Sequence, residues 1–354
     1  MGRVPTVWLV LGDKLGDNAQ VEVVAEALGW PVERKRLVCK APYVTGKPSF
    51  RASLYHLDLQ HSDPLTPPWP DLVLTIGRRP SMAALWIRQQ SGGKTKLVLF
   101  GRPRRHAREF DLVIIPPQYF MPSGSNVLQL ELPLMRVSRT GTAREDMIWK
   151  ERLEKLPRPL VGVFVGGVTR TFAYDVEVAR ELLDSVRTAM GGQGTIYIST
   201  SRRTPREVVE ALVQHKPDNA ILYRWGVDDE KENPYRALLA YADGCVVTSD
   251  SISMMVEVVR MNKPLAVFKL PVTWNWREKM KLKMGELMCR FGLSAWLYDR
   301  GWEIGGRNLE AFQDRFIRRG WAVTLDGSRF PYPPRTNEVP DEVDKVVSRI
   351  KSLF

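Results

Sequence analysis

The segment "GCVVTSDSISMMVEVVRMNKPLAVF" (residues 244–268) contains the pattern of a strand, a helix and a second strand. Its first residues form a short apolar run, and the hydroxyl and acidic side chains that follow are typical of a helix N-terminus. Apolar residues at helical spacing then fill residues 252–261, and another apolar run begins at Pro264. A strand, a helix and a strand in this order indicate a parallel α/β layer.

The same alternation continues along most of the chain. In the first half the predicted strands are residues 6–11, 33–38, 72–76, 96–100 and 112–115, and the predicted helices are residues 18–28, 81–90 and 144–156. In the second half the predicted strands are residues 160–165, 195–199, 220–223, 244–248 and 264–268, and the predicted helices are residues 175–190, 205–214, 234–241 and 252–261. The expected fold class is therefore α/β, with two Rossmann-like domains facing a cleft.

The domain boundary is predicted near "KLPRPL" (residues 155–160), where an amphipathic helix ends and a new strand begins. This gives an N-terminal Rossmann-like domain over residues 1–156 and a C-terminal one over residues 157–335. Residues 336–354 are expected to contain an amphipathic helix that docks on a domain, with one apolar face formed by Val343, Val346, Val347, Ile350 and Leu353.

The amino-acid composition favours some classes of binding partner and of cellular compartment over others. The 354 residues are 44% hydrophobic, which is enough for two cores, and 52 Lys and Arg against 40 Asp and Glu leave a net charge of +12. This charge favours acidic partners such as phosphates, nucleic acid or anionic lipid. The three scattered cysteines disfavour a disulfide framework and a zinc site, and no apolar run is long enough to span a bilayer. We expect a cytoplasmic protein, at most peripheral on a membrane.

Glycine and arginine gather where the predicted strands end, which is where open α/β sheets bind ligands. Glycine permits close backbone approach, and arginine and helix N-terminal amides donate to phosphate oxygens. For any single loop the alternative stays open that these residues serve only as turns and caps. The loops are "GDKLGDN" (12–18), "GRRP" (77–80), "GRPRR" (101–105), "GGVTR" (166–170), "TSRRTP" (200–205) and "TSDSIS" (248–253).

The loop at residues 248–253 has a specific interpretation. Asp250 or Ser251 is expected to cap the next helix, with the amides near Ser253 and Met254 directed at a bound diphosphate. Glu257 would accept hydrogen bonds from ribose hydroxyls, or would simply be an exposed helix carboxylate. The absence of a Walker motif and of a full Gly-x-Gly-x-x-Gly argues against an ATPase and a standard NAD enzyme, and the scattered histidines give no metal-ligand spacing.

Several of these stretches together resemble a known family. "GDKLGDNAQVEVVAEALG", "VGVFVGG", "ISTSRRTP" and "VVTSDSISMMVEVVRMNKPLAVF" resemble the mitochondrial fission family called Elongated Mitochondria in plants and also found in bacteria, over most of residues 5–270. That family is similar to the GT-B glycosyltransferases, which hold a nucleotide-sugar donor mainly on the C-terminal domain. The resemblance implies donor contacts at Gly166, Gly167, Ser201, Arg202, Ser251, Ser253, Met254 and Glu257.

The first loop departs from the family pattern, which runs Asp-Gly-x-x-Gly-His. Here Asp17 stands where the histidine is expected, so Asp13 or Asp17 would have to act as the catalytic base. The plant member is described as a peripheral outer-membrane factor that recruits a dynamin-related protein, a role that requires no chemistry. Membership therefore leaves open whether this chain is an enzyme.

The first hypothesis is a GT-B-type glycosyltransferase that binds a nucleotide diphosphate-sugar as its substrate and requires no cofactor or metal. Arg170 and Arg203 join the donor contacts above, and Arg202 and Arg203 would stabilise the departing diphosphate. An acidic or lipid-linked acceptor would bind the acceptor-side residues Arg78, Arg79 and Arg102.

The alternative is a non-catalytic adaptor that binds an anionic membrane surface or a dynamin-like protein. It is suggested by Trp274 and Trp276, which stand among cations in "PVTWNWREKMKLKM". Nucleic-acid binding rests on charge alone and ranks last, because the arginines fall at strand ends and no binding module is recognised.

Overall fold

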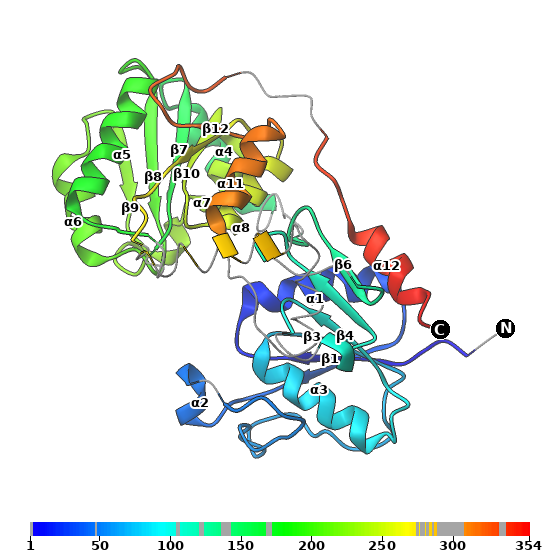
Figure 1. Cartoon of the computed structure of the whole chain (residues 1–354). Coiled ribbons are helices and arrows are strands. Elements are labelled where there is room, and N and C mark those ends of the chain that lie inside the picture. The colour runs from blue at the N-terminus through cyan, green and yellow to red at the C-terminus, as the bar shows by residue number, and fades with distance from the viewer. Residues whose placement is uncertain are drawn as a thin grey trace. The chain divides into compact units, whose positions relative to one another are not determined.

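The computed structural model describes residues 3–46, 48–103, 107–119, 124–135, 143–167, 172–273, 308–332 and 338–354, together with residues 276, 280, 283–284 and 287–288. The chain forms two compact units. The first comprises Met1–Arg136, Lys281–Arg307 and Pro340–Phe354, and the second comprises Val137–Met280 and Asn308–Val339. Each unit contains a six-stranded parallel sheet with helices packed on it (Figure 1).

In the first unit the strand order is β2-β1-β3-β4-β5-β6. The strands are β1 (Val7–Leu11), β2 (Val32–Arg36), β3 (Leu72–Ile76), β4 (Lys96–Phe100), β5 (Leu112–Ile115) and β6 (Val127–Gln129), all paired in parallel. The helices are α1 (Leu15–Leu28), α2 (Ala41–Thr45), α3 (Arg78–Gln90) and α12 (Val343–Lys351), with a 3₁₀ turn at Ala107–Glu109.

Strand β1 shows why this sheet is buried on both faces. Successive side chains of a strand point to opposite faces, so Leu9 joins the core formed with α1 and α12, whereas Trp8 and Val10 join the core formed with α3. Both faces therefore need apolar residues, and the strand is an unbroken apolar run. Helix α1 ends at Gly29, whose φ of 67° is the left-handed conformation usual for a helix C-cap.

In the second unit the strand order is β12-β11-β10-β7-β8-β9. The strands are β7 (Leu160–Val165), β8 (Thr195–Thr200), β9 (Ala220–Tyr223), β10 (Gly244–Thr248), β11 (Leu265–Phe268) and β12 (Val323–Thr324), again all parallel. The helices are α4 (Ala143–Glu154), α5 (Val176–Ala189), α6 (Arg206–His215), α7 (Tyr235–Tyr241), α8 (Ile252–Arg260) and α11 (Leu309–Arg318), with a 3₁₀ turn at Glu230–Glu232.

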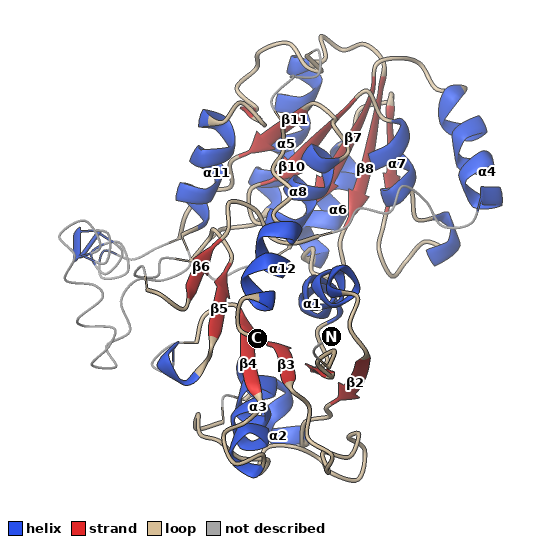
Figure 2. Cartoon of the chain, turned by 90° about the vertical axis from the view of Figure 1, so that its right-hand side faces the viewer, coloured by secondary structure: helices blue, strands red, loops and turns tan. Residues whose placement is uncertain are grey.

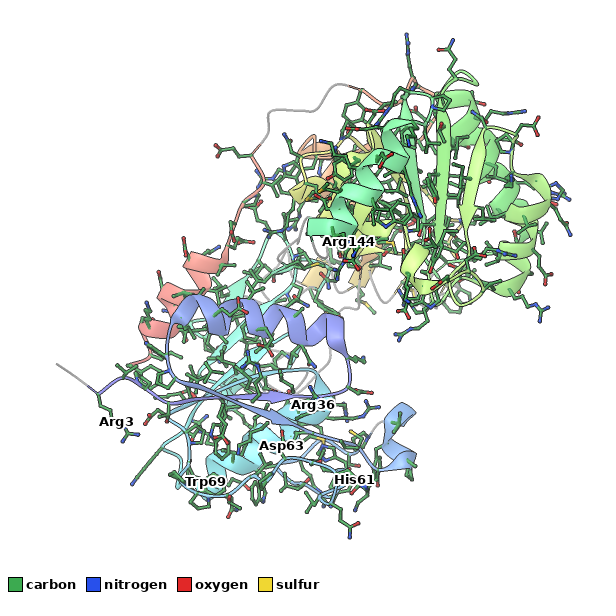
Figure 3. All side chains as sticks on the ribbon, turned by 180° about the vertical axis from the view of Figure 1, so that it is seen from behind. Arg3, Arg36, His61, Asp63, Trp69 and Arg144 are labelled. Carbon is green, nitrogen blue, oxygen red and sulfur yellow. The ribbon has the colours of Figure 1, made fainter. Side chains whose placement is uncertain are left out.

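The Pro-rich connection before β3 is tied to the first unit at several points. The Arg36 amide donates to Asp63 Oδ2 over 2.7 Å, and the Asp63 amide donates back to the Arg36 carbonyl over 3.0 Å (Figure 3). The Trp69 ring lies 5.9 Å from both the Trp8 and the Trp86 ring centroids. The stretch from Asp63 to Asp71 is therefore a connection within the first unit.

Helix α4 belongs to another unit than the domain predicted for it, and helix α12, predicted to dock on a domain, belongs to the first unit. Helix α4, placed before the boundary at residue 156, belongs to the second unit, where the Tyr241 hydroxyl donates to Asp146 Oδ1 over 2.6 Å and Arg152 pairs with Glu232. Helix α12 is an integral part of the first unit and lies beside α1, as Figure 2 shows. Its apolar face was predictable, but its partner was not, because periodicity gives the buried face of a helix and not the surface that covers it.

The glutamate before α12 completes its docking. Glu342 is buried, and its Oε2 accepts from the backbone amides of Glu131 over 2.6 Å and Leu132 over 3.2 Å.

Among the described residues there is no helix with the length and apolar character needed to cross a membrane.

Candidate functional site

Three strand ends of the second unit meet at Gly166, which follows β7. The Gly166 amide donates to Thr248 Oγ1 at the end of β10 over 2.8 Å. Its carbonyl accepts from Ser201 Oγ over 2.9 Å and Thr204 Oγ1 over 2.6 Å in the turn after β8. The Gly167 amide donates to Asp250 Oδ2 over 2.8 Å. In this structure both glycine amides and the Ser201 hydroxyl thus already donate to protein oxygens.

Both positions require glycine because neighbouring groups approach them closely. A Cβ atom on Gly166 would lie 2.1 Å from Asp250 Oδ2, and one on Gly167 would lie 2.3 Å from Arg203 Cβ. Neither distance is possible for a real side chain. The Gly166-Gly167 pair therefore serves close packing between β10 and the turn after β8.

Asp250 does not cap α8, so of the two alternatives that the sequence leaves for the N-cap position, Asp250 and Ser251, the first is excluded. Ser251 occupies the N-cap position, but its own side chain makes no capping hydrogen bond. Asp250 reaches across to Gly167 instead, because β7 lies beside β10 in the sheet. The first turn of α8 carries no acidic residue, so the positive end of the helix dipole favours an anion there. Ser253 is exposed and Met254 is partly exposed on this turn.

Arg202 and Arg203 are exposed in the turn that follows β8. The turn is tight, since the Ser201 amide donates to Thr204 Oγ1 over 2.8 Å and the Thr204 amide donates to the Ser201 carbonyl over 3.0 Å. Arg203 packs against Gly167, and the Gly167 amide donates a hydrogen bond to Asp250. A single glycine therefore lies between this turn and the end of β10. Arg170 lies outside the described residues.

Glu257 is half-buried on α8 and is not the exposed carboxylate of the alternative interpretation. The Tyr235 hydroxyl, on α7, donates to Glu257 Oε2 over 2.7 Å. Burial raises the pKa of Glu257 above its ordinary value, and the bond from Tyr235 opposes that shift. Burial, and then the charge of Glu257, raise the pKa of Tyr235 well above 10.0. No sequence signal connects Tyr235 with this site, because the two residues lie on different helices.

Asp250 is only 2% exposed. Burial raises its pKa, while the hydrogen bonds from Thr248 Oγ1 (2.7 Å) and the Gly167 amide oppose the shift. The Tyr174 hydroxyl is buried near this carboxylate, and its pKa is raised first by burial and then by the charge of Asp250. Thr248 and Tyr174 are both residues that the sequence-based site prediction missed.

A cavity of about 270 Å³ lies at the carboxyl ends of β1 and β3 in the first unit. Arg78 and Arg79 line it, but much of their hydrogen-bonding capacity is used within the protein. Arg78 Nε and Nη2 donate to the Pro48 carbonyl over 3.1 and 2.8 Å, and Arg79 Nη2 donates to the Gly46 carbonyl over 3.2 Å. The other lining residues are Gly12, Asp13, Lys14, Asn18, Leu37, Cys39, Gly46, Pro48, Leu57, Ile76, Gly77 and Pro80, so Arg102 is not among them.

The two candidate bases have different surroundings. The Asp13 side chain is 60% exposed at the rim of this cavity, and its Oδ1 lies 3.9 Å from Arg79 Nη1. Asp17 lies in the first turn of α1, which begins at Leu15 and thus earlier than predicted; its side chain is outside the described set. Across the part of the chain that the structure describes, no group of three or more His, Cys, Asp or Glu side chains is placed to hold a metal ion.

The model of the family "Mitochondrial fission ELM1" matches residues 16–290. The chain belongs to this family. The ELM1 protein of Arabidopsis thaliana is 27% identical over 220 residues, which cover 56% of this chain and 51% of that protein. The match thus spans about half the length of this plant relative. The uncharacterised protein RP120 of Rickettsia prowazekii is 22% identical over 298 residues, covering 75% of this chain and 83% of that protein.

Solved structures share the architecture at low sequence identity. A UDP-GlcNAc 2-epimerase from Methanocaldococcus jannaschii superposes with a TM-score of 0.52 and 9% identity, covering 99% of this chain and 100% of the other. A glycosyltransferase from Rickettsia africae gives a TM-score of 0.50 and 11% identity, covering 99% of each chain. At this identity the likeness shows the fold, so this Elm1-family chain has a GT-B-like fold with two Rossmann-like sheets.

Proposed function

We propose that this Elm1-family chain is a GT-B-type glycosyltransferase that binds a nucleotide diphosphate-sugar at the carboxyl edge of the second unit's sheet. The observation that carries the proposal is the uncapped N-terminus of α8, which is linked through Gly167 to the exposed Arg202-Arg203 turn. Helix N-terminal amides and arginine forks are the usual partners of phosphate oxygens. The proteins that share this fold include one named as a glycosyltransferase and one named for UDP-GlcNAc, which supports the choice of ligand class.

Each group of residues has a role in this proposal. The α8 amides, with Ser253 and Met254 on the same turn, would bind the diphosphate, and Arg202 and Arg203 would stabilise its charge as the sugar departs. Glu257, held by Tyr235, would accept hydrogen bonds from the ribose hydroxyls. Gly166, Gly167 and Ser201 would shape the site through their internal bonds, with Ser251 at the N-cap of α8.

The acceptor is assigned to the cavity of the first unit. Lys14, Arg78 and Arg79 give its lining a positive charge suited to an acidic or lipid-linked acceptor, and Asp13 on its rim is the candidate base. Leu37, Leu57 and Ile76 add apolar surface for the rest of such a molecule. The donor and acceptor assignments rest on different units, so an experiment can refute one of them without refuting the other.

A panel of nucleoside diphosphates and nucleotide sugars tests the donor assignment, with thermal unfolding and isothermal titration as readouts. A ligand that binds only the folded chain raises its unfolding temperature. We expect stabilisation by one nucleotide class, lost in the Arg202→Ala, Arg203→Ala double variant. The matched control is Arg206→Ala, whose side chain is highly exposed and pairs with Glu210 on α6. No stabilisation by any of them at millimolar concentration would overturn the proposal.

A different observation supports a second candidate function, attachment to an anionic membrane surface. Met280, Met284 and Leu287 are 51%, 50% and 54% exposed, and Trp276 is also exposed. Their spacing of four, four and three residues is helical, and the intervening sequence carries Arg277, Lys279, Lys281 and Lys283. Apolar residues among cations favour the headgroup region of anionic lipid.

Vesicle co-sedimentation tests this second function. Binding to phosphatidylserine-containing vesicles, and not to neutral ones, is expected for the wild type and should be lost in Met284→Asp. Met147→Asp is the control, since Met147 on α4 is a similarly exposed methionine in a different element. Equal sedimentation of wild type and Met284→Asp would eliminate this candidate.

A further inference from the structure

One glycine, Gly167, joins the end of β10 to the Arg202-Arg203 turn. Asp250 Oδ2 accepts the Gly167 amide, and Asp250 Oδ1 accepts the Thr248 hydroxyl. Built as an alanine, Gly167 would place its Cβ 2.3 Å from Arg203 Cβ and 2.4 Å from the Arg203 carbonyl oxygen. Gly167 therefore lies directly against the Arg203 backbone, with Asp250 bonded to its amide.

We propose that Asp250 is a positioning residue for the phosphate-binding arginines: by holding the Gly167 amide, it fixes the Arg202-Arg203 turn relative to the first turn of α8. This inference rests on the function proposed above and adds a residue to it. Asp250 is almost completely buried, so the role proposed for it is indirect. Its effect passes through the backbone of Gly167 to Arg203.

The surrounding hydrogen bonds make this path rigid. The Gly166 peptide is held on both sides, with its amide on Thr248 and its carbonyl on Ser201 and Thr204. Gly167 is the next residue, and its amide depends on Asp250. Without that acceptor the amide would be buried and unsatisfied, and the backbone would have to move to find another partner. Arg203 packs on this backbone and would move with it.

Asp250 and Arg203 also interact electrostatically. A buried carboxylate is costly, and burial raises the pKa of Asp250 above 3.8, whereas the positive charge of Arg203 lowers it. Asparagine could accept from Gly167 and donate to Thr248 without that cost. Substitution by asparagine should therefore keep an acceptor for the Gly167 amide and the position of the turn, while it removes the charge and reverses the hydrogen bond with Thr248.

The test uses the full-length chain and UDP, or the nucleoside diphosphate that stabilises it most in the panel above. We expect Asp250→Ala to weaken binding by about tenfold or more, and Asp250→Asn to restore most of the affinity. Hydrogen exchange of the ligand-free protein should show faster exchange of the Gly167 amide in Asp250→Ala, with protection retained in Asp250→Asn.

A double-mutant cycle separates positioning from a general structural role. If Asp250 acts through Arg203, the effect of Asp250→Ala on affinity should fall below about twofold in an Arg203→Ala background. Equal loss in both backgrounds would overturn the inference, as would wild-type affinity in Asp250→Ala. If Asp250→Ala does not fold, Asp250→Ser makes the same comparison with Asp250→Asn, because serine is too short to reach the Gly167 amide.

The failure of the inference is distinguishable from that of the proposed function. Absence of nucleotide binding by the wild type would remove the proposed function and this inference with it. Binding by the wild type that requires Arg202 and Arg203 but tolerates Asp250→Ala would leave the function standing and overturn the inference alone.

Discussion

The Tyr235 hydroxyl donates a 2.7 Å hydrogen bond to Glu257 Oε2, joining α7 to α8 across the surface of the second sheet. Both side chains are partly buried, and the ring of Tyr235 lies 4.7 Å from that of Phe164 on β7. The carboxylate is thus fixed in place by a neutral donor in a largely desolvated setting. Its titration should be visible in the pH dependence of stability.

Glu257→Gln should remove one pH-dependent contribution to stability. Burial raises the folded-state pKa of Glu257 above 4.5, so folding favours the protonated form. The contribution is therefore fully present below pH 4.5 and is lost as the pH rises through the folded-state pKa. Urea unfolding between pH 4 and 8 should show the wild type losing stability relative to Glu257→Gln over that window. A wild-type stability that stays parallel to that of Glu257→Gln, or that rises relative to it with pH, would contradict this. Glu181→Gln, at an exposed glutamate, is the control.

Gly166→Ala should destabilise the chain by about 2 kcal/mol or more, or prevent folding, because the new Cβ would lie 2.1 Å from Asp250 Oδ2. Gly162→Ala is the matched control on the preceding strand, where the nearest atoms would be 3.4 Å away, an ordinary contact. Denaturant unfolding measures both. Equal effects of the two alanines would show that the Asp250 contact does not restrict this position.

Ile350→Ala should cost about 2–5 kcal/mol of unfolding free energy, because Ile350 is fully buried in the core that α12 shares with α1. The neighbouring Lys351→Ala, on the exposed side, should change stability by less than about 0.5 kcal/mol. If both variants unfold like the wild type, α12 does not contribute to the stability of the first unit.

His56→Gln should make stability less sensitive to acid. His56 is fully buried with Nε2 3.0 Å from the Arg79 carbonyl, and burial lowers its pKa below 6.5, so folding favours the neutral ring. For a lowered histidine pKa, stability is fully present above pH 6.5 and is lost as the pH falls toward the folded-state value. Glutamine keeps a donor for Arg79 without titrating. The wild type should therefore lose stability relative to this variant between pH 6.5 and 5, and parallel curves would contradict the prediction.

The sequence predicted many elements closely because their signals are local. The strands at residues 72–76, 96–100, 112–115, 160–165, 220–223 and 244–248 are observed with the predicted bounds. Each is a mainly apolar run, and all except the edge strand β9 are largely buried on both faces, which makes their ends easy to recognise. Four elements, β6, β12, α2 and α11, were not predicted from the sequence. Three of them have five residues or fewer, which is too short for a periodic signal, whereas α11 is long and amphipathic enough to be predictable.

The candidate site was also predictable only in part. The glycines, arginines and hydroxyls at the strand ends were identifiable from the sequence, since a turn after a strand is recognised from its neighbours. The partners of these residues were not. Asp250 or Ser251 was expected to cap α8; Ser251 stands at the N-cap position, whereas Asp250 bonds Gly167. No sequence pattern indicated that Glu257 bonds Tyr235.

By itself the sequence determined the α/β class, most of the strands and helices, and the chemistry of the loops, because these follow from side-chain periodicity and turn residues over short distances. Only the tertiary structure decided which loops meet. Strand β7 lies between β10 and β8. That order brings Gly166 and Gly167 against Asp250 on one side and Arg203 on the other, although Gly167 and Asp250 lie 83 residues apart in the chain. Strand order depends on how whole strands and helices pack, and no local pattern in the sequence encodes it.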